Sequence, residues 1–285
     1  QYTDEEKLRA LTLITLSDVK AFAQTLYEQV YITGMVHGNW SDDKARQSVD
    51  ILLTALGSKP LPENERFEKV VEVMPEGEKF RFSREVADNN NSLAYAIQVG
   101  EKSLPLLAKT AIIASIVESD FYTQMRTNQQ LGYIVWSFHQ RIEDRIFIRL
   151  VIQSSTHGPF EMSKRVNTWL TSTEKLFSNL TDQEFERHQQ SLIIALEKEG
   201  DSIGAVAANL YSLATDEKGD FNFKKKMIRT IGDLKKADIA QTAAKIFRDS
   251  STPRLEVLMR AKGSEEEVPE EVITEVSQFK NRLKR

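Results

Sequence analysis

The sequence predicts an α+β fold in which an antiparallel sheet carries helices packed on one of its faces. Several stretches alternate apolar and polar residues with a period of two, the spacing of half-buried strands. Others repeat apolar residues every three or four positions, the spacing of amphipathic helices. Apolar residues make up 40% of the 285-residue chain and charged residues 28%, which is typical of a globular protein.

Residues 1–57 are expected to form a helix, a strand and a second helix. Ser17-Asp18 can cap the first helix, and the β-rich run Val30–Gly38 predicts a buried strand. Ser41 can cap the second helix, and Gly57 suits the position just beyond its end. The apolar positions of the two helices and the start of the strand are Val19, Phe22, Ala23, Leu26, Val30, Ala45, Val49, Leu52, Leu53 and Leu56.

Residues 58–64 are predicted to be a linker, because two prolines lie there among polar neighbours. Beyond it, residues 65–263 have the pattern of a complete α+β domain. Strands are expected over 67–74, 79–86 and 93–99, followed by a helix from Pro105 to about Met125 that is apolar on most sides and therefore buried. A hairpin with strands to about Gln140 and over 146–153 follows.

The rest of the chain is predicted to be mostly helical. A capping box, Thr181 with Glu184, opens one of these helices. Residues 264–285 form a charged tail, whose helix near 271–283 is only marginal on its own. The remaining predicted elements are helices over 160–178, 182–196, 203–214, 223–231 and 237–247 and a strand over 254–261.

One internal repeat bears on the domain organisation. The helix with Asp18-Val19, which leads into a strand over 31–37, is repeated about 220 residues later as Asp238-Ile239 leading into a strand over 255–260. If both copies close similar domains, residues 1–57 are the C-terminal end of a preceding α+β domain. A chance match between two amphipathic helices is the alternative.

Composition excludes several classes of protein. The net charge is −4 with both signs mixed along the chain, so a nucleic-acid partner is not expected. The absence of cysteine excludes disulfides and thiolate zinc sites. No apolar run approaches the roughly 20 residues of a membrane helix, so no membrane partner is expected. The first residues lack both a signal peptide's pattern and an initiator methionine, which suggests a processed product or an excised piece.

The usual catalytic motifs are absent from the sequence. None of His37, His139, His157 and His188 lies four residues from another, so neither HExxH nor HxxEH occurs. G-x-S-x-G, Walker and G-x-G-x-x-G motifs are also missing. Glu184 and His188 share a helix face and could supply two metal ligands, but zinc requires three or four and the capping box already explains Glu184. We therefore expect no metal site in this chain.

The stretch Arg126–Val135 is unusual for a junction between a buried helix and a hairpin. Arg126 offers five hydrogen-bond donors in a fixed fork and Tyr133 a hydroxyl on a rigid ring, which suits binding to a peptide backbone or an oxyanion. The alternative is structural: an arginine that complements the helix dipole, with Gly132 easing the turn into a strand. The residues alone leave both interpretations open.

This stretch, R-T-N-Q-Q-L-G-Y-I-V, resembles the R-T-x-x-Q-L-G-Y-x-V signature of the insulinase and pitrilysin family of zinc metallopeptidases, found in the family's C-terminal half. Its surroundings are similar too, with a helix ending F-Y-T-Q-M before it and a hairpin running to V-I-Q-S after it. The segment Val36–Asn39 resembles the strand end that closes the family's third domain.

The resemblance implies four metallohydrolase-like α+β domains, paired into two halves that close as a clamshell around a peptide. Because zinc and its HxxEH motif belong to the N-terminal half, this chain would be the end of the third domain plus the fourth. It would be inactive alone, with Zn²⁺ bound outside this chain. Its partners would be the peptide substrate and the N-terminal half of the same zinc metalloendopeptidase.

The resemblance also implies roles for single residues. Arg126 would hold the substrate's backbone carbonyl, and Tyr133 would assist catalysis by helping to stabilise the tetrahedral intermediate formed by zinc-bound water. Gly132 would let the backbone bend so that Tyr133 points into the chamber.

Two further hypotheses are a non-catalytic scaffold or binding subunit of a heteromeric peptidase complex, and an independent enzyme that uses Glu184 and His188. The periplasm is expected ahead of the cytoplasm, because bacterial family members are often exported and missing cysteines permit export.

Overall fold

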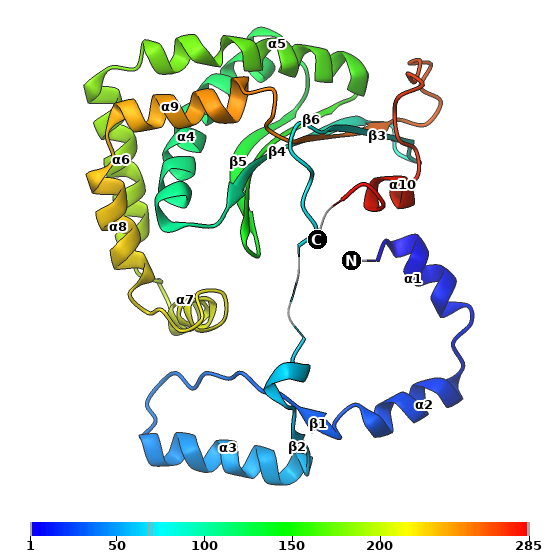
Figure 1. Cartoon of the computed structure of the whole chain (residues 1–285), viewed down its shortest axis with the longest axis vertical. Helices are drawn as coiled ribbons and strands as arrows, with labels where there is room; N and C mark the ends of the chain where they lie inside the picture. The colour runs from blue at the N-terminus through cyan, green and yellow to red at the C-terminus, as the bar shows by residue number, and fades with distance from the viewer. Residues whose placement is uncertain (1, 68, 70, 284–285) are drawn as a thin grey trace. The chain divides into compact units, whose positions relative to one another are not determined.

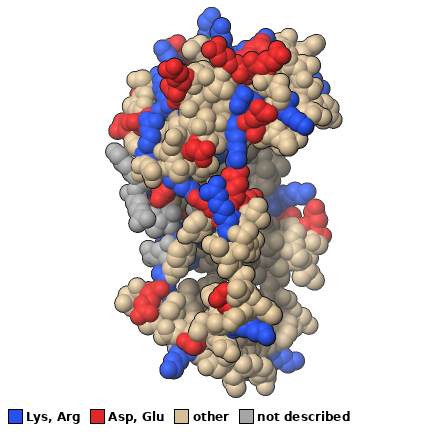
Figure 2. Space-filling view, turned by 90° about the vertical axis from the view of Figure 1, so that its right-hand side faces the viewer, with Lys and Arg blue, Asp and Glu red and all other residues tan. Residues whose placement is uncertain are grey.

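The computed structural model describes residues 2–67, 69 and 71–283 (Figure 1). Contacts within the chain divide it into two compact units. The smaller unit holds the described residues up to 67 together with Gly200–Gly219. The larger unit holds Lys69–Glu199 and the described residues from Asp220 onward. Both signs of charge are interspersed over the face shown in Figure 2.

The larger unit is built on a five-stranded sheet in the order β3-β7-β4-β6-β5. The pairs β7–β4, β4–β6 and β6–β5 are antiparallel, whereas β3 and β7 run parallel. The predicted α+β sheet is thus confirmed, with the addition of one parallel pair at one edge. The strands are β3 (Lys79–Glu85), β4 (Asn91–Glu101), β5 (Ile134–Ile142), β6 (Arg145–Ser154) and β7 (Arg254–Arg260).

Helices cover one face of this sheet (Figure 1). Alternate side chains of the strands, such as Leu93, Ile97 and Ile148, point to this face and are fully buried. The helix closest to the sheet is α4 (Leu104–Tyr122), where Pro105 lies in the first turn and ten residues are buried, as its continuous apolar sequence predicts. The other helices of the larger unit on this side are α5 (Pro159–Ser178), α6 (Asp182–Glu197), α8 (Phe223–Asp233) and α9 (Lys236–Arg248).

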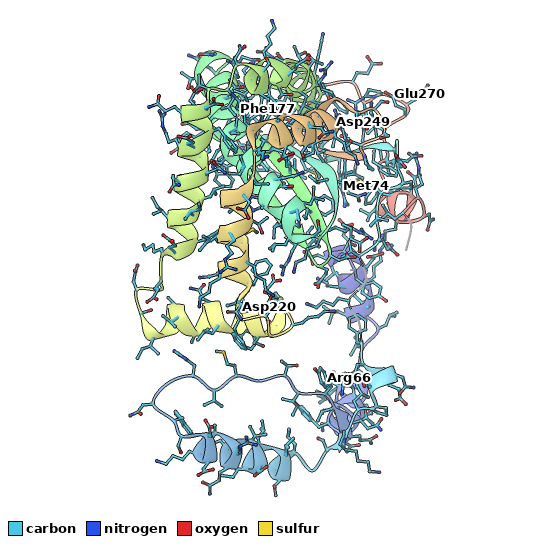
Figure 3. All side chains as sticks on the ribbon, turned by 60° about the vertical axis from the view of Figure 1, so that its left-hand side comes forward. Arg66, Met74, Phe177, Asp220, Asp249 and Glu270 are labelled. Atoms are coloured by element: carbon cyan, nitrogen blue, oxygen red, sulfur yellow. The ribbon has the colours of Figure 1, made fainter. Side chains whose placement is uncertain are left out.

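Aromatic contacts join α5 to α4 and α9. The ring of Trp169 lies 4.9 Å from that of Phe121 and 6.4 Å from that of Phe247. Phe177, labelled in Figure 3, stacks on Phe247 at 6.2 Å. The Trp169 indole N–H also donates to Asp120 Oδ2 at 2.6 Å, so its polar edge is satisfied.

The opposite face of the sheet has a second apolar cluster at its β3 edge. Phe80 and Phe82 of β3 are buried there, and the ring of Phe279 lies 5.0 Å from that of Phe80. Ile273 donates its N–H to the carbonyl of Arg81 and accepts the N–H of Ser83, which fixes the C-terminal segment beside β3. The helix in this segment, α10 (Val276–Lys280), is shorter than the predicted range 271–283.

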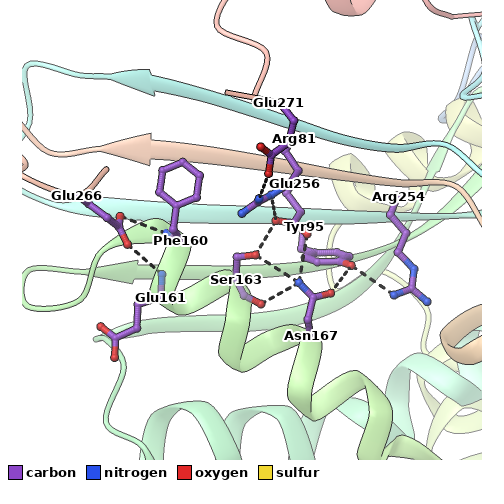
Figure 4. Close-up of polar contacts among 10 residues, drawn as sticks. All are labelled: Arg81, Tyr95, Phe160, Glu161, Ser163, Asn167, Arg254, Glu256, Glu266 and Glu271. Atoms are coloured by element: carbon purple, nitrogen blue, oxygen red, sulfur yellow. Dashed lines mark hydrogen bonds and ion pairs between the residues drawn. The ribbon is translucent and has the colours of Figure 1, made fainter. Parts of the chain in front are cut away.

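A buried polar network joins β3, β4, β7 and α5 (Figure 4). The carboxylate of Glu256 on β7 accepts hydrogen bonds from Arg81 Nε at 3.2 Å, Ser163 Oγ at 2.6 Å and Asn167 Nδ2 at 3.2 Å. Asn167 in turn accepts the hydroxyl hydrogen of Tyr95 at 3.0 Å. Because both carboxylate oxygens of Glu256 accept hydrogen bonds, the fold can bury this charge.

Between residues 2 and 67, the apolar side chains of the smaller unit are exposed or half-buried. No described residue between 2 and 67 is buried, although the helices form close to where the sequence predicts them. Val19 and Phe22 are exposed on α2, as are Val49 and Leu52 on α3. The elements are α1 (Asp4–Leu11), α2 (Leu16–Thr25), β1 (Gln29–Val30), α3 (Asp42–Leu56), β2 (Lys59–Pro60), η1 (Glu63–Glu65) and α7 (Ile203–Thr215).

Several local predictions for this unit are wrong. Of the strand predicted over Val30–Gly38 only Val30 is in a strand, since β1 covers Gln29–Val30 and pairs with β2 over two residues. The cap of α2 is Thr15, with Asp18 as its capping-box partner rather than as the cap. Helix α1 was not predicted. Ser41 and Gly57 do flank α3 as expected, with Gly57 in the left-handed conformation at φ 60°.

The strand predicted over 67–74 is also absent from the described residues; residues 68 and 70 lie outside them. The backbone of Met74 is bound by a side chain instead of a strand. Its N–H donates to Gln98 Oε1 at 3.0 Å, and its carbonyl accepts from Gln98 Nε2 at 3.1 Å. A register irregularity in β4 lies beside this contact, between Gln98 and Gly100.

His188 links α6 to α4. Its Nδ1 lies 2.8 Å from Ser115 Oγ. Burial is the main reason that its pKa lies below the ordinary value of 6.5, Arg187 lowers it further, and Glu184 acts in the opposite direction.

Replacing Glu256 by alanine should cost about 3–5 kcal/mol of unfolding free energy, because Arg81, Ser163 and Asn167 lose their shared acceptor inside the fold. Urea unfolding of the purified chain measures this. Glu271→Ala is the matched control, since that carboxylate also pairs with Arg81 but is 69% exposed, and should cost no more than about 1 kcal/mol. Equal losses in the two variants would show that the network does not hold α5 to the sheet.

The stability of the chain should fall as the pH drops below about 6.5, and His188 should contribute to that fall. A lowered folded-state pKa means that the unfolded state binds the proton more readily, so the contribution of His188 is present above pH 6.5 and lost on acidification. Unfolding free energies at two pH values on either side of this value should differ less in His188→Gln than in the wild type. The same substitution at the exposed His37 is the control, and an unchanged pH dependence in His188→Gln would contradict the assignment.

Candidate functional site

The helix that precedes the Arg126–Tyr133 stretch changes its winding where the stretch begins. The α-helical part ends at Tyr122, and the chain continues as the π-helical turn η2 (Thr123–Asn128). Its last bond runs from the N–H of Gln129 to the carbonyl of Gln124, five residues back, at 3.1 Å. The predicted helix to Met125 was therefore correct in extent but not in winding. Single π turns in α-helices often occur at functional sites.

Two buried side chains fix this stretch to the core. Met125 and Leu131 are both fully buried, and the N–H of Leu131 donates to the carbonyl of Met125 at 2.9 Å. Between them Gln130 adopts a left-handed conformation with φ 52°, which turns the chain back on itself. The loop is thus held on both sides of its bend, and its polar residues are directed outward.

Arg126 and Tyr133, seven positions apart in sequence, lie side by side. The guanidinium carbon of Arg126 is 5.4 Å from the centre of the Tyr133 ring, within the range of a cation–π contact. Arg126 is partly buried and Tyr133 is 85% exposed. Neither an acidic side chain pairing with Arg126 nor a hydrogen-bond acceptor for the Tyr133 hydroxyl is found among the described residues. Both groups are therefore free to donate to a ligand.

Gly132 is required for space. A Cβ atom at this position would lie 1.9 Å from the carbonyl oxygen of Gln153 and 2.8 Å from its carbonyl carbon. The backbone just before Tyr133 therefore passes directly over the end of β6, which only glycine permits. We expected Gly132 to ease a bend, but the left-handed residue is Gln130 and Gly132 provides the close approach.

The other candidates from the sequence do not form sites. The Glu184 carboxylate accepts the N–H of Thr181 at 2.9 Å and its hydroxyl hydrogen at 2.7 Å, and these bonds lower the pKa of Glu184. His188 faces Ser115. Within the described part of the chain, no group of three His, Asp or Glu side chains is arranged to hold a metal ion. Glu184 and His188 therefore lack the third ligand that a zinc site requires.

Gly132→Ala should destabilise the chain by about 1–3 kcal/mol, because the new methyl group forces the loop away from the carbonyl of Gln153. Gly232→Ala is the matched control. It lies in α8 with open space around its Cα, so alanine should stabilise the chain by about 0.5–1 kcal/mol. Thermal or urea unfolding measures both. A neutral Gly132→Ala would mean that the contact with Gln153 does not constrain the loop.

Comparisons with known proteins agree with this geometry. A family model described as "PQQ synthase PqqF-like, C-terminal lobe domain 4" matches residues 112–211, which include the whole Arg126–Tyr133 stretch. A nardilysin-like protein of Arabidopsis thaliana is 28% identical over 94% of this chain. Human insulin-degrading enzyme is 26% identical over 84% of it.

The fold agrees as well. The crystal structure of pitrilysin superposes with a TM-score of 0.84 over 99% of this chain, at 21% sequence identity. The chain covers 30% of that structure, 27% of the nardilysin-like protein and 24% of insulin-degrading enzyme. It therefore spans only 24–30% of the length of these relatives. The signature stretch, the family model and the shared fold together make the chain similar to the C-terminal portion of insulinase/pitrilysin-type peptidases.

Proposed function

We propose that this chain supplies substrate-binding and transition-state-stabilising residues to the active site of a zinc metalloendopeptidase that degrades peptides. The observation that supports this most is the pair Arg126 and Tyr133, two unpaired donors held together on a loop fixed to the core. Zinc is proposed to be bound by the N-terminal half of the same enzyme, because the described residues of this chain offer no site for it. The chain alone is then inactive.

Arg126 is proposed to bind a backbone carbonyl of the peptide. A guanidinium offers several N–H donors in one plane, so it can hold a carbonyl while keeping its contact with the Tyr133 ring. The Tyr133 hydroxyl is proposed to donate to the oxygen of the scissile carbonyl as negative charge develops on it. A donor aimed at that oxygen acts most strongly when the closed enzyme has excluded water.

The loop geometry supports a role that needs fixed donors. The buried side chains of Met125 and Leu131 attach the loop to the core, and Gly132 allows the backbone before Tyr133 to pass close to the end of β6. Donors held in place need less reorganisation during the reaction, which is the main source of oxyanion stabilisation. The structural alternative, an arginine that only complements a helix dipole, does not require an exposed tyrosine beside it.

The division into domains remains a proposal. Residues 1–57 are proposed to be the end of a preceding α+β domain, 58–64 a linker, 65–263 a complete domain and 264–285 a charged tail. The exposed apolar faces of α2 and α3 support the first part, since amphipathic helices of this kind need a partner surface. That surface is proposed to come from the rest of the preceding domain.

A non-catalytic scaffold subunit of a heteromeric peptidase complex remains the second candidate, supported by the same exposed apolar faces. No helix among the described residues is long and apolar enough to cross a membrane. The periplasm is proposed ahead of the cytoplasm as the location of the intact enzyme.

In the enzyme assembled with its N-terminal half, Tyr133→Phe should lower kcat by about 10²–10³-fold, corresponding to about 2.7–4 kcal/mol of lost oxyanion stabilisation. KM and zinc content should change little, because the ring and its contact with Arg126 remain. Peptide cleavage and metal analysis of the same preparations measure this.

Tyr211→Phe is the control, since Tyr211 is an exposed tyrosine on α7 whose hydroxyl has no proposed role. Arg126→Ala should raise KM as well as lower kcat, because it removes ground-state binding of the peptide. Full activity in Tyr133→Phe would rule out the role proposed for this hydroxyl. Cleavage at wild-type rates without any added N-terminal half would rule out the division of the active site.

A further inference from the structure

A cavity of about 220 Å³ lies directly beside Tyr133. Its walls come from three parts of the larger unit: Asn90 before β4, Gly132 and Tyr133, and the segment from Gln153 to Thr156 at the end of β6. Sites for drug-sized ligands are usually about 300–1,000 Å³, so this cavity suits a single amino-acid side chain.

The wall opposite Tyr133 is rigid. The hydroxyl oxygen of Ser154 accepts the backbone N–H of Thr156 at 3.2 Å and that of His157 at 2.9 Å, which folds the segment into a tight turn. Ser154 is itself buried, and Thr156 Oγ1 is held 3.0 Å from His157 Nδ1. The structure places this turn against the loop of Tyr133.

The other wall is rigid for a different reason. Gly132 lies against the carbonyl of Gln153, and the pairing of Ile134 with Gln153 at the start of β5 holds these two segments together. Asn90 is held by Asp88, whose Oδ1 accepts the backbone N–H of Asn90 at 2.7 Å and its side-chain N–H at 3.1 Å. The cavity therefore exists before any ligand arrives.

The chemistry of the walls selects the ligand. They carry amides and hydroxyls, from Asn90, Gln153, Ser155 and Thr156, and no Asp, Glu, Lys or Arg lines them. A charged side chain entering the cavity would lose water without gaining a counter-ion there, whereas an uncharged polar side chain can exchange its hydrogen bonds with water for bonds to the walls. An apolar side chain would leave those polar groups unpaired.

We propose that this cavity is a specificity subsite that binds one uncharged polar side chain of the peptide, of the glutamine, asparagine, serine or threonine class. It lies beside the residue whose backbone contacts Arg126 and Tyr133, and in this respect the inference rests on the proposed function. Ser155 is the residue best placed to test it, because its side chain is exposed on the wall and has no role in holding the turn.

Binding can be tested on the chain itself by NMR, with N-acetyl-glutamine amide as the probe and N-acetyl-leucine amide and N-acetyl-lysine amide as comparisons. The glutamine probe should shift the backbone amide signals of Asn90, Ser155 and Thr156, and the other two should not. Ser155→Ala should weaken binding of the glutamine probe about two- to tenfold, the effect of one hydrogen bond. Ser155→Leu, which also fills the space, should weaken it more.

Ser172→Leu is the matched control, an exposed serine on α5 that lines a different cavity. It should leave the shifts unchanged. Shifts of equal size with the leucine or lysine probe, no shifts with the glutamine probe, or shifts that survive Ser155→Leu would each overturn the subsite.

Cleavage by the assembled enzyme separates this inference from the proposed function. Peptides that differ in one residue near the scissile bond should show a preference for an uncharged polar residue at one position, and Ser155→Leu should abolish that preference. If Tyr133→Phe has no effect on cleavage but the glutamine probe still binds the chain, the proposed function fails and the cavity stands as a binding site. If Tyr133→Phe is impaired and no preference is found, the subsite fails alone.

Discussion

The position of α4 between the sheet and the other helices is the constraint on which the rest of the larger unit depends. Its residues Ile112, Ile113 and Val117 are almost inaccessible to solvent, so the helix has no freedom to rotate or slide. The position of α4 therefore determines where η2 and the Arg126–Tyr133 stretch begin. The π turn at its end adds one residue to the winding, and Met125 remains in the core while Arg126 is directed outward.

The functional pair is therefore a product of the core. Arg126 and Tyr133 contribute little to stability themselves, since an exposed cation–π contact is worth only about 0.5–1 kcal/mol. Their arrangement is set by neighbours that are buried or sterically confined, chiefly Met125, Leu131 and Gly132. This explains why a stretch rich in polar residues can have a defined conformation at the surface of the protein.

The sequence predicted the larger unit well because each of its elements carries its own pattern. The long apolar run of α4, the capping box of Thr181 and the alternation in β4 are local signals that the tertiary structure did not override. The run Val30–Gly38 also carries a strand pattern, but a strand requires a partner, and local pattern contains no information about partners. The strand predicted over 67–74 was wrong for a related reason. At Met74 the backbone N–H and carbonyl form hydrogen bonds with the side chain of Gln98 rather than with a neighbouring strand.

The candidate site was only partly predictable. The donor groups of Arg126 and Tyr133 follow from residue chemistry, and their function was suggested by the family signature. Their contact at 5.4 Å, the left-handed Gln130 and the closeness of Gly132 to Gln153 depend on how η2 winds and where β6 ends. The cavity beside Tyr133 was beyond sequence reasoning, since it combines side chains from positions 90, 133 and 155.

The strand order has a consequence for how the protein is made. Strand β7 lies between β3 and β4, although it follows them by about 160 residues in the chain. During synthesis β3 therefore has no neighbour in the sheet until the segment Arg254–Arg260 has left the ribosome, whereas β4, β6 and β5 can pair much earlier. Nascent chains must spend that interval with the apolar side chains of β3 uncovered, and chains that end before β7 cannot complete the sheet.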